Sequence, residues 1–245
     1  MDIVAETEQK NRELQKKRSV AVFYPLEPAR LSLGDLVVYS YRVWQDEFQQ
    51  APSARQVARA VGMGRSAVMH ADRALTTTGL LDGNLIPQEP PEGWFQKSET
   101  VDPVRHWRHG YASWTKYVPK PDCRMSLLTV CCWSYIACCA QSGRTPKHGL
   151  GASYLCRVLC ADRTSVQRVL ATLGNTGLVQ RHEGSWCPTL ASLDWLADEG
   201  DAAQSNGKVS PVQWVGLPEG KVVAVPTKPR PALITCVDCQ DTATT

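Results

Sequence analysis

Apolar residues between positions 33 and 48 recur every three or four residues, the spacing of an amphipathic helix; they are Leu33, Leu36, Val37, Tyr41 and Trp44. Pro52-Ser53 opens a second predicted helix over 53–61. A third is expected over 65–77, after the turn Gly62-Met63-Gly64 and before the stop at Gly79. The apolar pairs at 80–81 and 85–86 then flank Asp82-Gly83-Asn84, which is typical of a compact hairpin.

The same succession of elements is predicted again further along the chain. Helices are expected over 126–141, 151–160 and 163–175, with Asp162 as the N-cap of the last helix and Gly177 as its stop. Strands over 178–180 and 186–188 flank a predicted hairpin tip at 181–185. Both parts of the chain are therefore expected to form three helices followed by a hairpin.

Aligned residues show that these two parts are an internal repeat. With an offset of 94 positions Ser40 falls on Ser134, and with an offset of 98 Thr78-Gly79-Leu80 falls on 176–178. The offset changes within 143–150, where Gly and Pro indicate a loop that tolerates an insertion. Two copies predict two similar small domains, because a solenoid would need more repeats.

Residues 164–181, TSVQRVLATLGNTGLVQR, resemble the recognition helix and first wing strand of the winged helix-turn-helix superfamily. That pattern has a polar-capped helix, an inward Val and Leu pair, and a small residue with Gly-Leu before the wing. Residues 65–81 are similar, although Asp72 stands where the second copy has Leu170, and we expect Asp72 to be exposed. The resemblance implies a mainly α chain with small β-hairpins (α+β), built from two winged helix-turn-helix domains in tandem.

The expected domain order is a polar N-terminal arm (1–22), a first winged-helix domain (23–90), a linker (91–115), a second winged-helix domain (116–196) and a Pro/Gly-rich tail (197–245). The arm is expected to be a solvated helix or disordered, with phosphate contact or dimerisation as alternatives. The aromatic and basic residues of 104–117 are expected to cover the core or bridge the domains. Binding of nucleic acid is the alternative for this segment.

The charge of each segment is more informative about function than the net charge of the whole chain. The 245 residues carry 27 Lys and Arg against 24 Asp and Glu, a formal net charge of +3. Residues 116–190 hold nine basic and three acidic residues, a balance of +6, whereas 19–86 are neutral and 191–245 carry −3. A basic second copy is the electrostatic footprint expected of a module that binds duplex DNA.

Helical facing assigns candidate DNA contacts in the second copy. The core face of 163–175 is expected to hold Val166, Val169, Leu170 and Leu173. On the opposite face Gln167 and Arg168 are expected to read base edges, because Gln pairs bidentately with adenine and Arg with guanine. The neighbours expected to fix phosphates or share the reading are Arg163, Thr164 and Ser165.

Further contacts are expected outside this helix. Arg181 and His182 at the hairpin tip, with Lys147 in the inserted loop, are candidate phosphate or minor-groove contacts. The matching outward positions of the first copy are Arg65, Ser66, Met69, His70 and Arg73. Met69 is a poor base reader, so the neutral first copy is expected to contribute weaker DNA contacts, to pack against its partner domain, or to dimerise.

No sequence motif points to catalysis or to a cofactor. A Walker loop, a dinucleotide fingerprint, a nucleophile elbow and a His-Glu-x-x-His motif are all missing, so we expect neither an enzyme nor a bound cofactor. Cysteines in the two apolar stretches are expected to fill the core; they are Cys131, Cys132, Cys138, Cys139, Cys156 and Cys160. We expect no metal: His106 and His109 lack a third ligand nearby, and Cys236 and Cys239 form a single pair whose role stays open.

Membrane insertion and export are not expected either. No stretch of the sequence approaches the ~18 apolar residues that a bilayer span requires. The acidic N-terminus lacks the basic start and apolar core of a signal peptide. We therefore expect a cytoplasmic, nucleoid-associated protein.

Two winged helices in tandem resemble plasmid and phage replication initiators. The resemblance implies sequence-specific binding of double-stranded DNA by a replication initiator or a transcriptional regulator, with a homodimer as an open alternative to a monomer. An accessory factor for partition, conjugation or excision of a mobile element is one further alternative. A winged-helix scaffold that binds protein is another, because the fold alone does not decide the partner. Two reading heads predict a footprint of ~20 base pairs.

Overall fold

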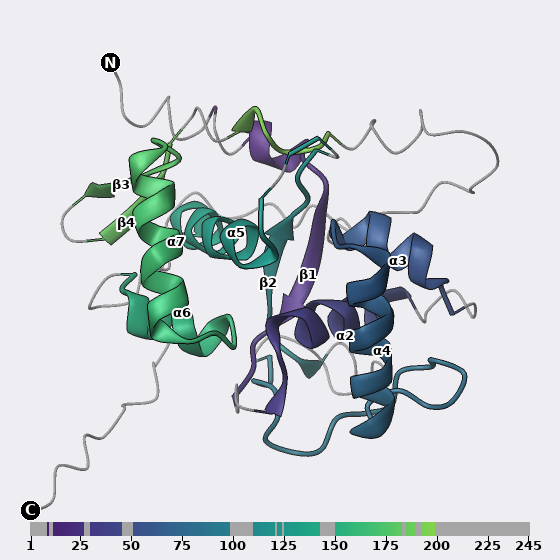
Figure 1. Ribbon diagram of the computed structural model, residues 1–245. Helices are drawn as coiled ribbons and strands as arrows, with labels where there is room; N and C mark the ends of the chain where they lie inside the picture. The colour runs from purple at the N-terminus through teal and green to yellow at the C-terminus, as the bar shows by residue number, and fades with distance from the viewer. Residues whose placement is uncertain are drawn as a thin grey trace, which may run out of the picture. The chain divides into compact units, whose positions relative to one another are not determined.

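The chain contains two copies of one succession, a strand followed by three helices (Figure 1). The computed structural model describes residues 9, 12–26, 30–45, 51–98, 110–120, 122–123, 125–142, 150–182, 185–189 and 193–198. In the first copy β1 (Ser19–Phe23) precedes α2 (Leu33–Gln45), α3 (Ala54–Val61) and α4 (Arg65–Thr77). In the second copy β2 (Ser113–Tyr117) precedes α5 (Leu127–Ser142), α6 (Ala152–Val158), α7 (Arg163–Asn175) and a hairpin of β3 (Val179–His182) and β4 (Ser185–Pro188).

Local sequence explains where these helices begin and end. Ser53 caps α3 by a capping box: its hydroxyl accepts from the Gln56 N–H, and the Gln56 side chain accepts from the Ser53 N–H at 2.8 Å. Both α4 and α7 are followed by glycines with positive φ, Gly79 at 76° and Gly177 at 71°. The predicted bounds of α4 and α7, 65–77 and 163–175, are confirmed.

The hairpins after these two helices differ. In the second copy β3 and β4 pair antiparallel, which confirms the predicted hairpin and extends its strands to His182 and from Ser185. In the first copy residues 80–88, all of them described, form a compact turn with an isolated bridge between Leu81 and Pro87 in place of two paired strands. The described residues thus combine α-helices with small antiparallel sheets, in agreement with an α+β class.

The two copies are joined by the antiparallel pairing of β1 with β2. In the register of this pair Ala21 lies opposite Thr115. These residues are equivalent in the two copies, since the repeat offset here is 94. An antiparallel pair of equivalent strands is related by a local twofold rotation, so a pseudo-twofold axis passes through the Ala21–Thr115 pair.

Hydrogen bonds on each side of this axis match. The Phe23 N–H donates to Ser40 Oγ at 3.1 Å, and the equivalent Tyr117 N–H donates to Ser134 Oγ at 3.0 Å. The segments after the helices match as well: the Leu26 N–H donates to the Trp94 carbonyl, and the Lys120 N–H donates to the Trp195 carbonyl, both at 2.9 Å. The expected boundaries at 22/23 and 115/116 therefore fall inside β1 and β2, and Trp94, which was assigned to the linker, contacts the first copy.

The polar arm also contributes to the folded part. Leu14 is only 1% exposed, and Lys17 forms an ion pair with Asp198 at 2.8 Å. The Arg18 N–H donates to the Ala197 carbonyl. The described end of the arm is therefore packed, which is at odds with a wholly solvated or disordered segment.

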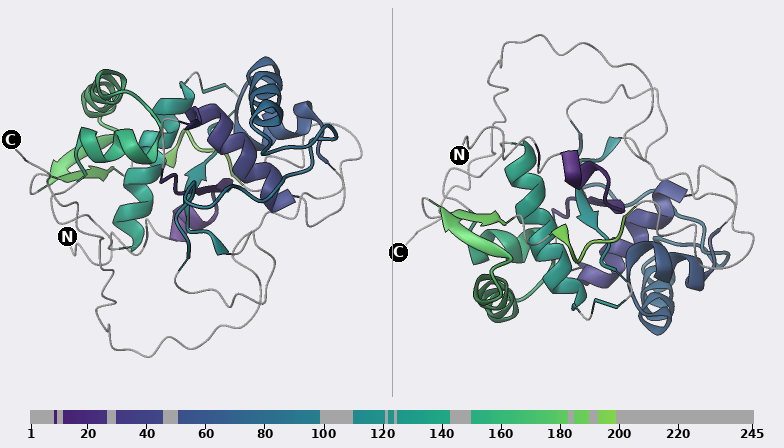
Figure 2. Two further views of the ribbon diagram at one scale, coloured as in Figure 1. Left: turned by 90° about the horizontal axis from the view of Figure 1, so that it is seen from below. Right: turned by 90° about the horizontal axis from the view of Figure 1, so that it is seen from above.

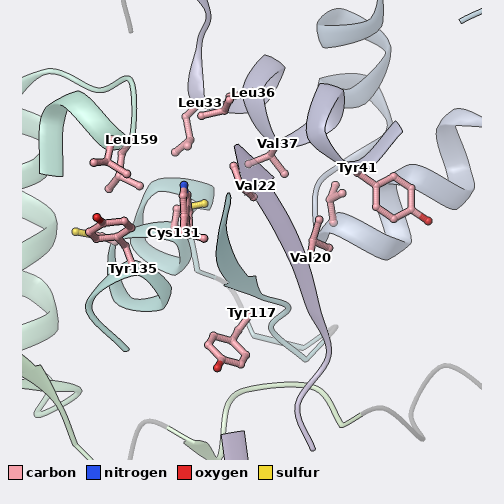
Figure 3. Packing of buried hydrophobic residues seen from close by; sticks show 14 of the residues in the cluster. Val20, Val22, Leu33, Leu36, Val37, Tyr41, Tyr117, Cys131, Tyr135 and Leu159 are labelled. Atoms are coloured by element: carbon pink, nitrogen blue, oxygen red, sulfur yellow. The ribbon is translucent and has the colours of Figure 1, made fainter. Parts of the chain in front are cut away.

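One continuous apolar core spans both copies (Figure 3). Figure 3 shows Val22 and Leu36 from the first copy packed beside Cys131 and Leu159 from the second. Trp114 and Tyr117 are buried, which confirms the core-covering role for these two members of the 104–117 segment. The buried thiols, whose pKa values are raised to about 12 by burial, are Cys131, Cys132 and Cys139, as core filling requires.

One ammonium group is buried between the copies. Lys116 of β2 is 0% exposed, and its Nζ donates to the carbonyls of Val61 at 2.6 Å and Tyr117 at 3.2 Å. Burial lowers the pKa of this amine. Because Val61 ends α3, the contact fixes the α3–α4 turn of the first copy to a strand of the second.

The two third helices lie on one side of the molecule. Figure 2 shows α4 and α7 both at the upper edge of its left view and both at the lower edge of its right view. Figure 1 shows that they run in opposite directions, since α3 and α6 lie at opposite ends of the pair. All described residues belong to one unit, Met1–Trp214. Within them, no helix has the length and apolar character that crossing a bilayer requires.

Candidate nucleic-acid interface

The start of α7 is fixed by its cap. Asp162 adopts extended backbone geometry, and its carboxylate accepts from the Ser165 N–H at 2.8 Å. The hydrogen bonds from Ser165 lower the pKa of this exposed carboxyl. The predicted N-cap is confirmed, and it sets which residues of the first turn face outward.

The predicted facing of α7 is confirmed. Val166, Leu170 and Leu173 are buried, and Val169 is half-buried against the same core. The exposed side chains on the other face are Arg163, Thr164, Gln167 and Arg168, while Ser165 is half-buried beside the cap. This face holds three strong side-chain donors and a hydroxyl, with Asp162 as the adjoining carboxylate.

The β3–β4 hairpin places a second group of polar side chains beside this helix. Arg181 and His182 are exposed on β3. The Arg181 guanidinium lies over the ring of Trp186 on the paired strand, 4.9 Å from its centroid. Trp186 in turn packs against Gly174 of α7, where an added Cβ would meet the ring at 3.5 Å. The ring therefore orients the arginine and holds the hairpin on the helix.

The first copy presents a different surface on α4. The predicted contacts Arg65, Ser66, His70 and Arg73 are all exposed, and Met69 is 39% exposed. Its hairpin tip carries no cation: the Asp82 carboxylate instead accepts from the N–H groups of Asn84 and Ile86, both at 2.8 Å. Compared with α7 and its hairpin, this surface has fewer groups that can recognise a base or a phosphate.

The expectation that Asp72 is exposed is wrong. Asp72 is 5% exposed and accepts two hydrogen bonds from Arg42 of α2, from Nε and Nη2, both at 2.8 Å. Arg42 is 1% exposed and also donates to the Pro52 carbonyl. Burial is tolerated because the two charges neutralise each other in bidentate geometry. The second copy has Ile136 and Leu170 at the equivalent positions.

Sequence reasoning missed two features of this side of the molecule. The sequence places Trp186 on a strand, but its stacking on Arg181 depends on the register of the hairpin. The only sequence signal for this contact was the presence of an aromatic residue in the second strand. Arg55 and Arg59 of α3 are exposed and four residues apart, so they lie on one helix face beside α4. Their spacing in the sequence was the available signal.

Other residues that the sequence singles out lie outside the described residues. These are the expected DNA contact Lys147, and the residues considered as metal ligands, His106, His109, Cys236 and Cys239. Within the part of the chain that the structure describes, no three His, Cys, Asp or Glu residues are grouped as metal ligands would be.

Comparison with protein-family models, with curated proteins and with solved structures finds no match to this chain.

Proposed function

We propose that the chain binds double-stranded DNA sequence-specifically through two winged-helix domains, with the second domain as the principal reader. The observation that carries this proposal is the outer face of α7, where Arg163, Thr164, Gln167 and Arg168 stand exposed beside a hairpin with Arg181. An α-helix with such a face fits the major groove of B-DNA.

Two side chains have the chemistry of base recognition. Gln167 can pair bidentately with adenine, and Arg168 with guanine. Each lies within the first two turns of α7, the part of a recognition helix that reaches base edges. Arg163, Thr164 and Arg181 have the chemistry of phosphate contacts, which fix register without reading sequence. The +6 balance of residues 116–190 supports the electrostatic part of binding.

The first copy would act as a second, weaker head. Arg65 occupies the position of Arg163, and Arg73 adds a cation on the same helix. His70 stands where α7 has Arg168, and Met69 stands where it has Gln167. Phosphate contacts with little base reading are the expected contribution of this surface.

As biological role we propose plasmid- or phage-type replication initiation or transcriptional regulation, in the cytoplasm and associated with the nucleoid. The support is the resemblance of tandem winged helices to such proteins. A role in partition, conjugation or excision of a mobile element uses the same binding chemistry. A homodimer would double the footprint of ~20 base pairs that two heads predict.

The test is selection of bound duplexes from a random pool, followed by affinity measurements against salt on the selected duplex. Affinity should fall steeply with salt. Gln167→Ala and Arg168→Ala should each cost ~1–3 kcal/mol on that duplex and relax base choice at one position. Lys97→Ala is the matched control, because Lys97 is an exposed cation outside α4, α7 and the hairpins.

Absence of duplex binding at low salt would exclude the proposal and favour a protein-binding scaffold. Normal binding by both α7 variants would exclude α7 as the reader.

A further inference from the structure

We infer that the chain reads a two-part duplex site whose half-sites run in opposite directions, although one polypeptide supplies both reading helices. This inference rests on the proposed function and adds the polarity of the site. A tandem repeat in the sequence would by itself suggest a direct repeat in the DNA. The geometry of the two copies points the other way.

The first step is the pairing of β1 with β2. Ala21 and Thr115 are equivalent residues and lie opposite one another in an antiparallel register. A translation along the chain would place equivalent strands parallel to each other. An antiparallel register instead relates the copies by rotation about an axis through this pair.

The second step is that the matched contacts extend from the strands to the reading helices. The Leu80 N–H donates to the Leu75 carbonyl at 3.0 Å, and the Leu178 N–H donates to the Leu173 carbonyl at 2.9 Å. The helices themselves match in length, since α4 and α7 each have 13 residues at an offset of 98. Matched bonds also tie each strand to the first helix of its copy, from Phe23 to Ser40 and from Tyr117 to Ser134. We therefore infer that the rotation relating the strands also relates α4 to α7.

The third step is the common side and the opposite directions of these helices (Figures 1 and 2). B-DNA has local twofold axes perpendicular to its length, and a protein twofold axis that coincides with one of them places its helices on inverted half-sites. Dimeric repressors use this match with two chains. Here the β1–β2 pairing supplies it within one chain.

The two half-sites should nevertheless differ in sequence. The outer face of α4 carries Ser66, Ala67, Met69 and His70, whereas the equivalent positions of α7 carry Thr164, Ser165, Gln167 and Arg168. The site of the native chain is therefore inverted in polarity without being a palindrome. Because the two half-sites differ in sequence, a selected site does not show their relative direction. A variant whose two helices recognise the same half-site is therefore needed.

The test is a variant whose two helices read alike: Ser66→Thr, Ala67→Ser, Met69→Gln and His70→Arg together. All four native side chains are exposed, so the fold should tolerate the change. Selection from a random duplex pool should recover the α7 half-site twice, as an inverted repeat about one helical turn apart. A duplex with the same two elements as a direct repeat should bind on the order of 10-fold or more weakly.

Recovery of a direct repeat, or of a single half-site, would overturn the inference while leaving DNA binding intact. Failure of the native chain to select any duplex would instead overturn the proposed function, so the two failures are distinguishable. The reciprocal variant, Thr164→Ser, Ser165→Ala, Gln167→Met and Arg168→His, is the matched control. It should lose the α7 half-site and bind the inverted repeat no better than the direct repeat.

Discussion

The buried ion pair between Arg42 and Asp72 allows a quantitative test of how the two copies solve the same packing problem. Asp72→Leu removes the acceptor of two hydrogen bonds from a guanidinium whose side chain is 0% exposed. Arg42 would then keep only its bond to the half-buried Pro52 carbonyl. Leaving one partner of a buried pair uncompensated costs ~3–5 kcal/mol.

The double variant Arg42→Ile/Asp72→Leu should recover most of that loss. It reproduces the residues of the second copy, where Ile136 is 0% and Leu170 is 4% exposed. Replacement of a buried pair by well-packed apolar residues is often neutral or stabilising by ~1–4 kcal/mol. The expected free energy of unfolding is therefore that of the native chain within about 1–2 kcal/mol.

The assay is urea unfolding of the full chain, with the coupling energy taken from the two single variants and the double variant. For a chain of this size the single variant should also lower Tm by roughly 6–20 °C. Asp122→Leu is the control, because Asp122 is exposed and its loss should change stability by less than about 0.5 kcal/mol. A double variant as unstable as the sum of the singles, or a harmless Asp72→Leu, would refute the reasoning.

Three further predictions concern the hairpin and the buried titratable groups. Trp186→Ala should destabilise the chain by about 1–3 kcal/mol and weaken duplex binding, with Trp186→Phe restoring much of both, as measured by unfolding and by affinity on a selected duplex. Lys116→Met should remove a pH dependence of stability, because burial lowers the pKa of Lys116 in the folded chain. The native chain should therefore gain stability relative to the variant as pH rises from that lowered value towards 10.5. Urea midpoints of the two proteins that change in parallel over this pH range would contradict the prediction. Burial raises the pKa values of Tyr41 and Tyr117 to about 12, so the stability that they contribute is complete below their unfolded pKa of 10.0 and is lost as pH rises towards 12. An absorbance titration of the native chain should show these two side chains forming tyrosinate only as the pH approaches 12.

The helices could be predicted from the sequence because their signals are local. The bounds of α4 and α7 follow from an apolar stripe and from Gly79 and Gly177, where left-handed backbone favours glycine. The outward face of α7 follows from the same periodicity. The exposure of Arg163, Thr164, Gln167 and Arg168 could therefore be predicted from the sequence alone, whereas Ser165 is half-buried beside the cap.

The errors and omissions arose where a distant partner decides the outcome. The burial of Asp72 could not be predicted, because the partner that neutralises its charge, Arg42, lies 30 positions away on another helix. The strands β1 and β2 were missed because five residues give little alternation, and their pairing joins Ala21 to Thr115 across the whole first copy. Arg181 was placed at the hairpin tip without the ring of Trp186 that orients it.

The β1–β2 pairing also has a consequence for synthesis of the chain. When the ribosome reaches Thr77, at the end of α4, it has made β1 and the three helices that follow it. The partner of β1, β2, is complete only when Tyr117 has been added. Until β2 emerges, Val20 and Val22 lack neighbours from the second copy, and the edge of β1 is open to other chains. Contacts between residues so far apart also close slowly. The first copy should therefore remain aggregation-prone on the ribosome until the second copy follows, and the two should complete their folding together.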